Sequence, residues 1–125
     1  MTVLAAITLA GCASAGDRED AAADGAVRVL AAVDAQDGAG ACAALAPDTV
    51  EEIEQSAGQP CAEAVLDEDL PAPGRVVGAD VYGQWAQVRL DDDTLFLAVF
   101  PDGWRVVAAG CTPRGKQPYD CRIGG

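Results

Sequence analysis

The hydrophobic pattern of this chain changes from helical to extended near Arg75, and no other feature constrains its fold as strongly. Before this point, apolar residues recur at helical spacing between breaks rich in Gly, Pro and Asp. After it, four apolar runs of strand length follow one another, separated by short turn sequences. Helices followed by a series of antiparallel strands predict an α+β fold, with the helices packed on one side of a curved sheet.

The first half predicts one long helix and several short ones. The long helix, Ala21 to Gln36, is alanine-rich, and its apolar face carries Ala26, Val27, Leu30 and Val33. Shorter helical segments are expected at Ala41 to Leu45, from Pro47 through Ile53, and at Cys61 to Leu66. In the second of these, Thr49 and Glu52 have the spacing of a capping box.

The second half predicts four strands joined by tight turns. They span Arg75 to Tyr82, Gln84 to Leu90, Thr94 to Phe100 and Trp104 to Ala109. The turns fall at Gly83, at Asp91 to Asp93 and at Pro101-Asp102-Gly103. Because the third run is apolar on both faces, we expect it to be a central strand with a helix over at least one face. The three aspartates lack the ligand spacing of a calcium loop, so a hairpin turn explains them better.

Four cysteines beyond the N-terminal region indicate a domain that folds in an oxidising compartment; they are Cys42, Cys61, Cys111 and Cys121. Of the three connectivities available, we expect the pairing of sequence neighbours, Cys42 with Cys61 and Cys111 with Cys121. Each bridge closes a loop of roughly 10 to 20 residues, worth about 3 kcal/mol on the chain-entropy model. The competing interpretation is a zinc site, but the chain has no histidine and no C-x-x-C pair. We therefore expect no metal and no cofactor.

The N-terminal region ends an apolar run, Thr2 to Ala10, with the sequence Leu9-Ala10-Gly11-Cys12. The run is about half the roughly 20 residues that a membrane-spanning helix needs, and it is typical of the core of a signal peptide. The four residues resemble the signal of small bacterial lipoproteins, whose cysteine is diacylated on sulfur and becomes the new N-terminus. The resemblance implies a signal peptide at residues 1–11, a lipidated tether at 12–20 and a single domain at 21–125.

The sequence leaves two alternatives to a lipid-anchored protein. Cleavage after Ala13-Ser14-Ala15 would discard Cys12 and release a soluble secreted protein, and a chain without a working signal would not be exported. We favour the lipid anchor on Cys12, which places the domain on the extracytoplasmic face of the cell membrane.

The charge balance limits the partners of the chain. It holds 20 acidic residues against 8 Lys and Arg, a net charge of −12. Nucleic acids and anionic lipid surfaces select for clustered Lys and Arg, so neither is expected to be bound directly. The remaining partners are the membrane through the lipid anchor, an envelope protein and a small apolar ligand.

One stretch of the second half resembles a known family. The sequence Phe100-Pro101-Asp102-Gly103-Trp104-Arg105-Val106-Val107 is similar to the final hairpin of NTF2-like (nuclear transport factor 2-like) domains. The resemblance extends over Ala21 to Gly110, where helices precede the strands. It implies a cystatin-like cone, in which helices pack on a strongly curved four-stranded sheet and leave an apolar pocket. The segment from Cys111 to Cys121 is an addition to that pattern.

Two groups of residues are candidates for binding. Trp85 and Trp104 could line a ligand pocket, although large aromatic side chains in a small sheet more often belong to the core. Arg114, Lys116 and Tyr119 lie between the last two cysteines, in a loop that the expected disulfide would hold rigid. We expect any recognition epitope to include this loop.

The leading hypothesis is a non-enzymatic accessory lipoprotein that binds a small apolar ligand or an envelope protein. The first alternative is a pocket enzyme of isomerase or hydrolase type, whose carboxylate base would be Asp80 or Asp34. Tyr82, two residues from Asp80 on the same strand face, would be the acid partner. Because the chain has no histidine, its catalytic groups are few, and we expect no enzymatic activity. The second alternative is a structural envelope protein.

Overall fold

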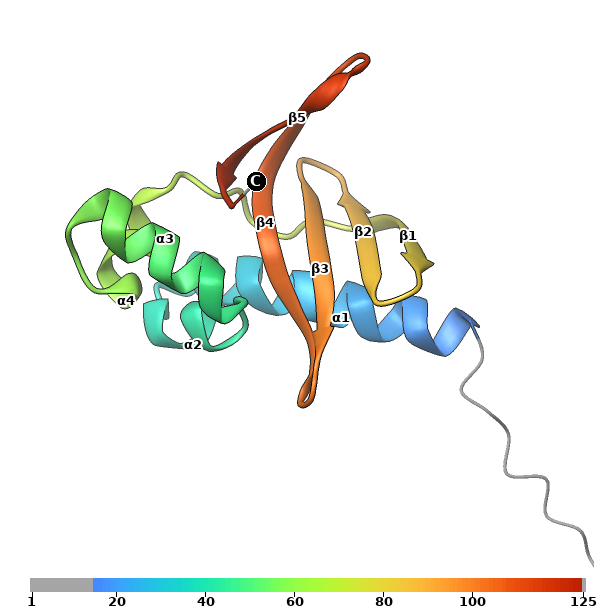
Figure 1. Cartoon of the computed structure of the whole chain (residues 1–125), viewed down its shortest axis with the longest axis horizontal. Helices are drawn as coiled ribbons and strands as arrows, with labels where there is room; N and C mark the ends of the chain where they lie inside the picture. The colour runs from blue at the N-terminus through green and yellow to red at the C-terminus, as the bar shows by residue number, and fades with distance from the viewer. Residues whose placement is uncertain (1–14, 125) are drawn as a thin grey trace, which may run out of the picture.

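The computed structural model describes residues 15–124, so Cys12 and the proposed signal residues 1–11 lie outside the described part. The helices come first: α1 (Ala15–Asp34), α2 (Gly38–Ala43), α3 (Pro47–Ala57), α4 (Cys61–Ala64) and the 3-10 turn η1 (Val65–Asp67). The strands follow: β1 (Val76–Tyr82), β2 (Trp85–Leu90), β3 (Thr94–Phe100), β4 (Gly103–Arg114) and β5 (Gln117–Ile123). The fold is therefore α+β, as the sequence predicts (Figure 1).

The strands form one antiparallel sheet in the order β1-β2-β3-β4-β5, with β3 in the centre as expected. The prediction of four strands is wrong, because β4 continues to Arg114 and β5 returns beside it. Gly115 makes the return with a φ of 61°, a conformation that glycine adopts without strain. The hairpin escaped prediction because it projects from the body of the protein, where exposed polar residues replace the apolar alternation of a covered strand (Figure 1).

Helix α1 crosses one face of the sheet and contacts β1, β2, β3 and β4. It begins at Ala15, earlier than the predicted Ala21, because the polar residues expected to form a tether continue the helix. Its buried side chains are Ala22, Ala23, Ala26, Val29, Leu30 and Val33, whereas Val27, expected on the same face, is only half-buried. Against them lie the fully buried strand residues Val88, Leu95, Leu97 and Val106. The core thus sits between α1 and the sheet.

The short helices pack beside the sheet and are held together by the expected disulfide between Cys42 of α2 and Cys61 of α4. The backbones approach so closely here that a Cβ on Gly38 would lie 1.8 Å from the carbonyl oxygen of Ala62. Only glycine fits at this contact. The second expected disulfide joins Cys111 and Cys121, which face each other across β4 and β5.

Helix α3 is fastened to the outer edge of β4. The amide of Ala46 donates to Val106 O at 2.8 Å, and the amide of Val106 donates to Ala44 O at 3.0 Å. The predicted capping box is wrong: Pro47 occupies the first turn, Ala46 is the N-cap, and no side chain caps the helix. Thr49 lies inside the helix and donates its hydroxyl to Val107 O at 2.9 Å, a bond that fixes α3 against the strand.

Strand β4 changes partners along its length, and a buried carboxylate marks the change. Its first half pairs with β3 as far as Ala108, and its second half pairs with β5. Beyond the last pair with β3, the side chain of Asp93 accepts hydrogen bonds from Gly110 N at 3.1 Å and Cys111 N at 3.0 Å. Asp93 is 8% exposed. Beyond Ala108, β3 no longer pairs with β4, and the Asp93 carboxylate accepts the hydrogen bonds of these two β4 amides instead.

At acidic pH we expect Asp93→Asn to cost about 1 to 2 kcal/mol of unfolding free energy, because an amide nitrogen cannot accept from the backbone donors at this position, whereas both oxygens of a carboxyl group can. Burial raises the pKa of Asp93 above its ordinary 3.8, although its hydrogen bonds to Gly110, Thr94 and Cys111 act in the opposite direction. The folded protein therefore binds this proton more tightly than the unfolded chain does. The stabilisation from Asp93 is greatest below the unfolded pKa and falls as pH rises through the folded pKa.

Urea denaturation of both proteins between about pH 3.5 and pH 7 measures this dependence. The difference in unfolding free energy between the two is expected to be largest at the acidic end and to shrink as pH rises above about 4. A difference that grows with pH would show that hydrogen bonding to the charged form outweighs burial at Asp93.

Candidate functional site

The aromatic residues of this chain are distributed unevenly between the two faces of the sheet. The chain contains two Trp, two Tyr and two Phe. The buried core holds Ala, Val, Leu, Ile and Cys side chains, and Trp104 packs against it from a half-buried position. All the other aromatics lie on the face away from α1: Tyr82, Trp85, Phe96, Phe100 and Tyr119.

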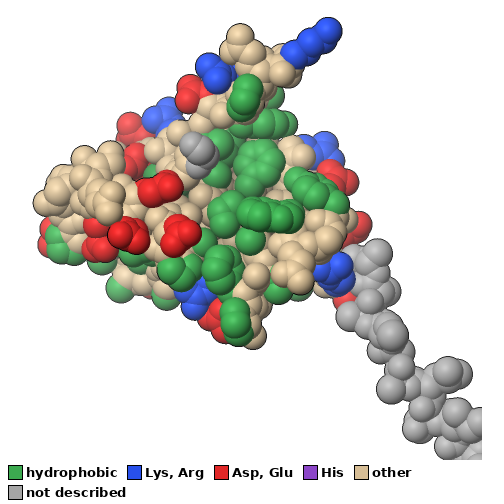
Figure 2. All heavy atoms as spheres, in the orientation of Figure 1, with side chains coloured by type: hydrophobic (Ala, Val, Ile, Leu, Met, Phe, Trp, Pro, Cys, Tyr) green, Lys and Arg blue, Asp and Glu red, His purple; other side chains and the backbone are tan. Residues whose placement is uncertain are grey.

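Strand alternation explains this placement. On β3, Leu95 and Leu97 point to the core, so Phe96, Ala98 and Phe100 point to the opposite face. Residues directly opposite each other on antiparallel strands share a face, and Trp85 is opposite Ala98 while Tyr82 is opposite Trp85. Figure 2 shows apolar side chains gathered over the strands on this face.

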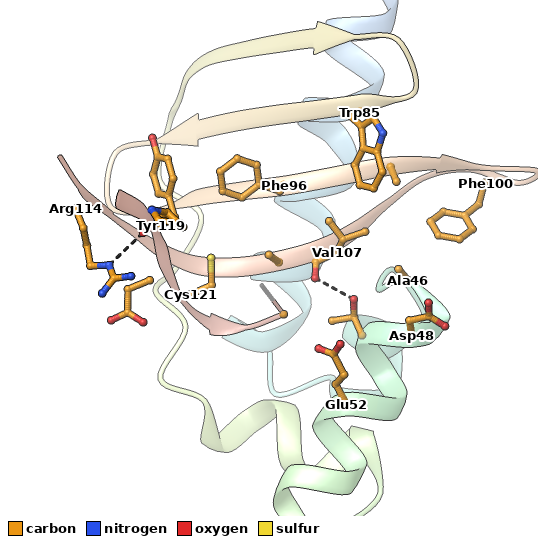
Figure 3. Close-up of a pocket in the computed structure, with 16 residues that line it drawn as sticks. Ala46, Asp48, Glu52, Trp85, Phe96, Phe100, Val107, Arg114, Tyr119 and Cys121 are labelled. Carbon is orange, nitrogen blue, oxygen red and sulfur yellow. Dashed lines mark hydrogen bonds between the residues drawn. The ribbon is translucent and has the colours of Figure 1, made fainter. Parts of the chain in front are cut away.

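These side chains line an open hollow of about 790 Å³ between the sheet, α3 and the β4–β5 hairpin (Figure 3). We call it the aromatic groove and define it by its apolar lining: Trp85, Phe96, Ala98, Phe100, Val107 and Tyr119. The ring of Tyr119 meets that of Phe96 edge-on, with centroids 5.1 Å apart. Gln87 Nε2 donates to the Tyr119 hydroxyl at 3.1 Å, so Tyr119 is anchored to β2 from the hairpin. Trp85 remains 54% exposed.

Acidic side chains border the groove on two sides. The acidic rim consists of Asp48 and Glu52 from α3 and Asp120 from β5. Asp48 and Glu52 are four residues apart and so lie on the same side of the helix. Within residues 15–124, no member of the rim forms an ion pair.

Two arginines lie at the groove, and both already have acceptors. Arg105, near the Phe100 ring, is paired with Asp102 and also donates to Leu45 O at 3.4 Å. The hydrogen bond from Arg105 lowers the pKa of Asp102 below its ordinary value, so Asp102 stays charged. Arg114 Nε donates to Pro118 O at 3.1 Å within the hairpin. This carbonyl does not neutralise Arg114, but the three acids of the rim outnumber its single charge, so the electrostatic balance of the groove is negative.

The residues predicted to bind do not all lie together in the structure. Trp85, Arg114 and Tyr119 line the groove together. Trp104 lies on the other face, with the guanidinium carbon of Arg18 5.7 Å from its ring centre. The core interpretation thus holds for Trp104 in part and is wrong for Trp85. Lys116 sits in the exposed turn of the β4–β5 hairpin and does not line the groove.

The candidate catalytic groups are not brought together. Asp80 is exposed and pairs with Arg89, with the two charged atoms 3.6 Å apart. Asp34 ends α1 and is exposed. Neither lines the groove, and Tyr82 continues the aromatic surface beyond Trp85 toward the edge strand β1.

Sequence reasoning missed Phe96, Phe100 and the acidic rim. The alternation of Phe with Leu and Val along residues 94–100 is the signal that could have found the two phenylalanines. It does not point to an open face, because a strand that is apolar on both faces is ordinarily covered on both. No local pattern indicates that α3 stands beside this face, since its position depends on bonds from Ala46 and Thr49 to β4.

Comparison with protein-family models, curated proteins and solved structures gave no match for this chain. Among residues 15–124, no helix combines the length and the apolar character needed to cross a bilayer. The function must therefore be inferred from the chemistry of the aromatic groove.

Proposed function

We propose that this protein is a lipid-anchored, extracytoplasmic binding protein without catalytic activity, and that the aromatic groove is its binding site. The occupant is a small apolar ligand or an apolar part of an envelope protein. One observation carries the proposal: the chain builds its core from aliphatic side chains and places nearly all of its aromatic residues on an open face. Large aromatic residues contribute most to stability when buried, so their exposure indicates selection for binding.

The proposed anchor supports a site close to the membrane. Cys12 precedes the first residue of α1 by three positions, a span of at most about 10 Å in an extended chain. Arg18 in the first turns of α1 donates to Gly83 O at 2.6 Å, in the turn between Tyr82 and Trp85. A lipid on Cys12 would therefore hold this end of the aromatic surface near the bilayer, where Trp and Tyr are favoured.

The NTF2-like cone belongs to the same proposal. Its support is the order of elements, helices before an antiparallel meander, and the position of α1 across one face of the sheet. The binding site does not depend on this assignment, because the aromatic groove lies on the face opposite α1 and a pocket inside a cone is not required.

The anchor predicts a defined covalent state. Protein purified from membranes of a native-type host is expected to begin at Cys12, to carry a diacylglyceryl group, and to gain mass on alkylation only after its two disulfides are reduced. Intact-mass spectrometry with and without reduction measures all of this. A Cys12→Ser variant is the control and is expected to leave the membrane fraction. A mature chain that starts at Gly16 would contradict the anchor and leave the groove unaffected.

If an apolar ligand binds in the groove, its affinity depends on the side chain of Trp85. We expect an uncharged apolar fluorophore such as Nile red to bind the full chain carrying Cys12→Ser, and Trp85→Ala to weaken this binding by about 2 kcal/mol. Titration of the fluorophore emission measures the affinity. The matched control is Val77→Ser, because Val77 is an exposed apolar residue that does not line the groove. Equal binding by wild type and both variants would place the apolar site elsewhere.

A further inference from the structure

The surroundings of the aromatic groove select the charge of what it binds. Its acidic rim, Asp48, Glu52 and Asp120, stands on both α3 and β5, and Figure 3 shows Asp48 and Glu52 on the helix beside Val107. Of the two nearby arginines, Arg105 is neutralised by its ion pair with Asp102, and the single charge of Arg114 is outnumbered by the three acids of the rim. With a net charge of −12, the whole chain adds to the same field. An anionic occupant is repelled from this face, and a cationic one is attracted to it.

The floor of the groove also suits a cation attached to an apolar stem. Exposed Trp and Tyr rings attract ammonium and guanidinium groups through their π faces. Lys and Arg side chains combine such a group with a methylene stem that packs on apolar surface. Trp85 lines the groove with roughly half of its surface exposed, and Phe96 and Tyr119 lie further along the floor.

The shape favours a length of polypeptide over a small molecule. Pockets for small molecules enclose most of their ligand, whereas the groove leaves Trp85 54% exposed. The aromatic surface also continues past the groove, because Tyr82 lies opposite Trp85 and is 54% exposed. From Tyr119 to Tyr82 this surface crosses β3, β2 and β1, so an occupant can extend over several strands.

From these observations we infer that the groove binds a segment of a partner protein in which Lys or Arg residues are interspersed with apolar residues. The inference rests on the proposed function and specifies the chemistry of its occupant. Apolar side chains of the segment pack on the aromatic floor, and its cations face Asp48, Glu52 and Asp120. This arrangement combines a desolvated centre with a charged rim, as in other protein recognition sites.

Three synthetic peptides of equal length and identical apolar residues test this inference, with Lys, Gln or Glu at the intervening positions. Each is labelled and titrated by fluorescence anisotropy against the full chain carrying Cys12→Ser, at about 0.05 M and 0.5 M salt. The Lys peptide is expected to bind most tightly and to lose about tenfold in affinity at the higher salt. The Gln peptide is expected to bind more weakly with little salt dependence, and the Glu peptide is expected not to bind.

Variants of the protein separate the floor from the rim. Trp85→Ala is expected to weaken binding of the Lys peptide by about 30-fold, and Trp85→Phe to restore much of it. The double variant Asp48→Asn, Glu52→Gln is expected to weaken the Lys peptide about 3- to 10-fold and to leave the Gln peptide unchanged. Its matched control removes two acids outside the groove, Glu51→Gln with Asp67→Asn, and is expected to change neither affinity more than about twofold.

The other outcomes test separately the charge selection, the polypeptide occupant and the groove as a binding site. Equal binding of all three peptides without salt dependence would overturn the charge selection and leave the aromatic groove as a binding site. Binding of Nile red without binding of any peptide would overturn the polypeptide occupant and favour a small apolar ligand. Absence of both would overturn the proposed function itself and favour a structural role. Circular dichroism of each variant confirms that it is folded.

Discussion

Replacing Cys42 and Cys61 together by serine is expected to lower the free energy of unfolding by about 3 kcal/mol. The bridge joins positions 19 residues apart and holds α2 against α4, so its loss frees a long loop in the unfolded chain. The side chain of Cys61 is also buried in the core cluster, where a hydroxyl is poorly accommodated. Urea denaturation at neutral pH, with the linear extrapolation for each protein, measures the change.

The double replacement of Cys111 and Cys121 is the matched comparison. This bridge spans only 10 residues, and β4 and β5 are also held together by backbone pairing. We expect a smaller loss of global stability and a local loosening of the hairpin, visible as faster amide exchange in β5. If this pair proved the more costly of the two to global stability, the hairpin would have to be part of the main folding unit.

Gly38→Ala is expected to destabilise the protein by about 3 kcal/mol, because the added methyl has no room. Its Cβ would lie 1.8 Å from Ala62 O and 2.7 Å from Ala62 C, and both are backbone atoms that cannot rotate away. Helices α2 and α4 would have to separate while the disulfide between them resists the separation. Thermal and urea unfolding of the variant with its disulfides intact measure the loss.

Gly58→Ala is a suitable control for Gly38→Ala. Gly58 ends α3 with a φ of 65°, and a Cβ added there would have open space around it to a distance of 4 Å. This substitution reports backbone strain alone, with a cost of about 1 kcal/mol. If the two variants were equally stable, the close approach at Gly38 would be absorbed by small helix shifts.

Much of the architecture follows from local patterns in the sequence. The uninterrupted apolar run of residues 95–100 correctly predicts the central strand, because such a sequence is typical of a strand that has neighbours on both sides. The turn at residues 91–93 and the sequence-local disulfides are also predicted correctly. In each case the determining residues lie within about 20 positions of one another, where turn chemistry and loop closure act.

The features that escaped prediction depend on contacts between distant residues. Trp85 and Trp104 have similar sequence surroundings, and only the register of β2, β3 and β4 places them on opposite faces. In the sequence, Asp93 is indistinguishable from the two other aspartates of its turn. Its structural role depends on β4, whose residues Gly110 and Cys111 donate to its carboxylate. Asp48 and Glu52 likewise border the groove only because α3 is bonded to β4 at Val107. Sequence patterns locate strands well but do not reveal which face a helix covers.

The change of partners along β4 has a mechanical consequence for the groove. Its α3 wall is fastened to β4 at Val106 and Val107, whereas the wall carrying Tyr119 and Arg114 belongs to the hairpin beyond Ala108. The two walls are therefore attached to different parts of one strand, and the hairpin wall is tied to the rest of the sheet through Tyr119, which contacts Gln87 and Phe96. An occupant that touches both acts as a crosslink between them, so that binding at α3 stiffens the hairpin at a distance. Protection of β5 amides from exchange would then report occupancy of a site that β5 only partly forms.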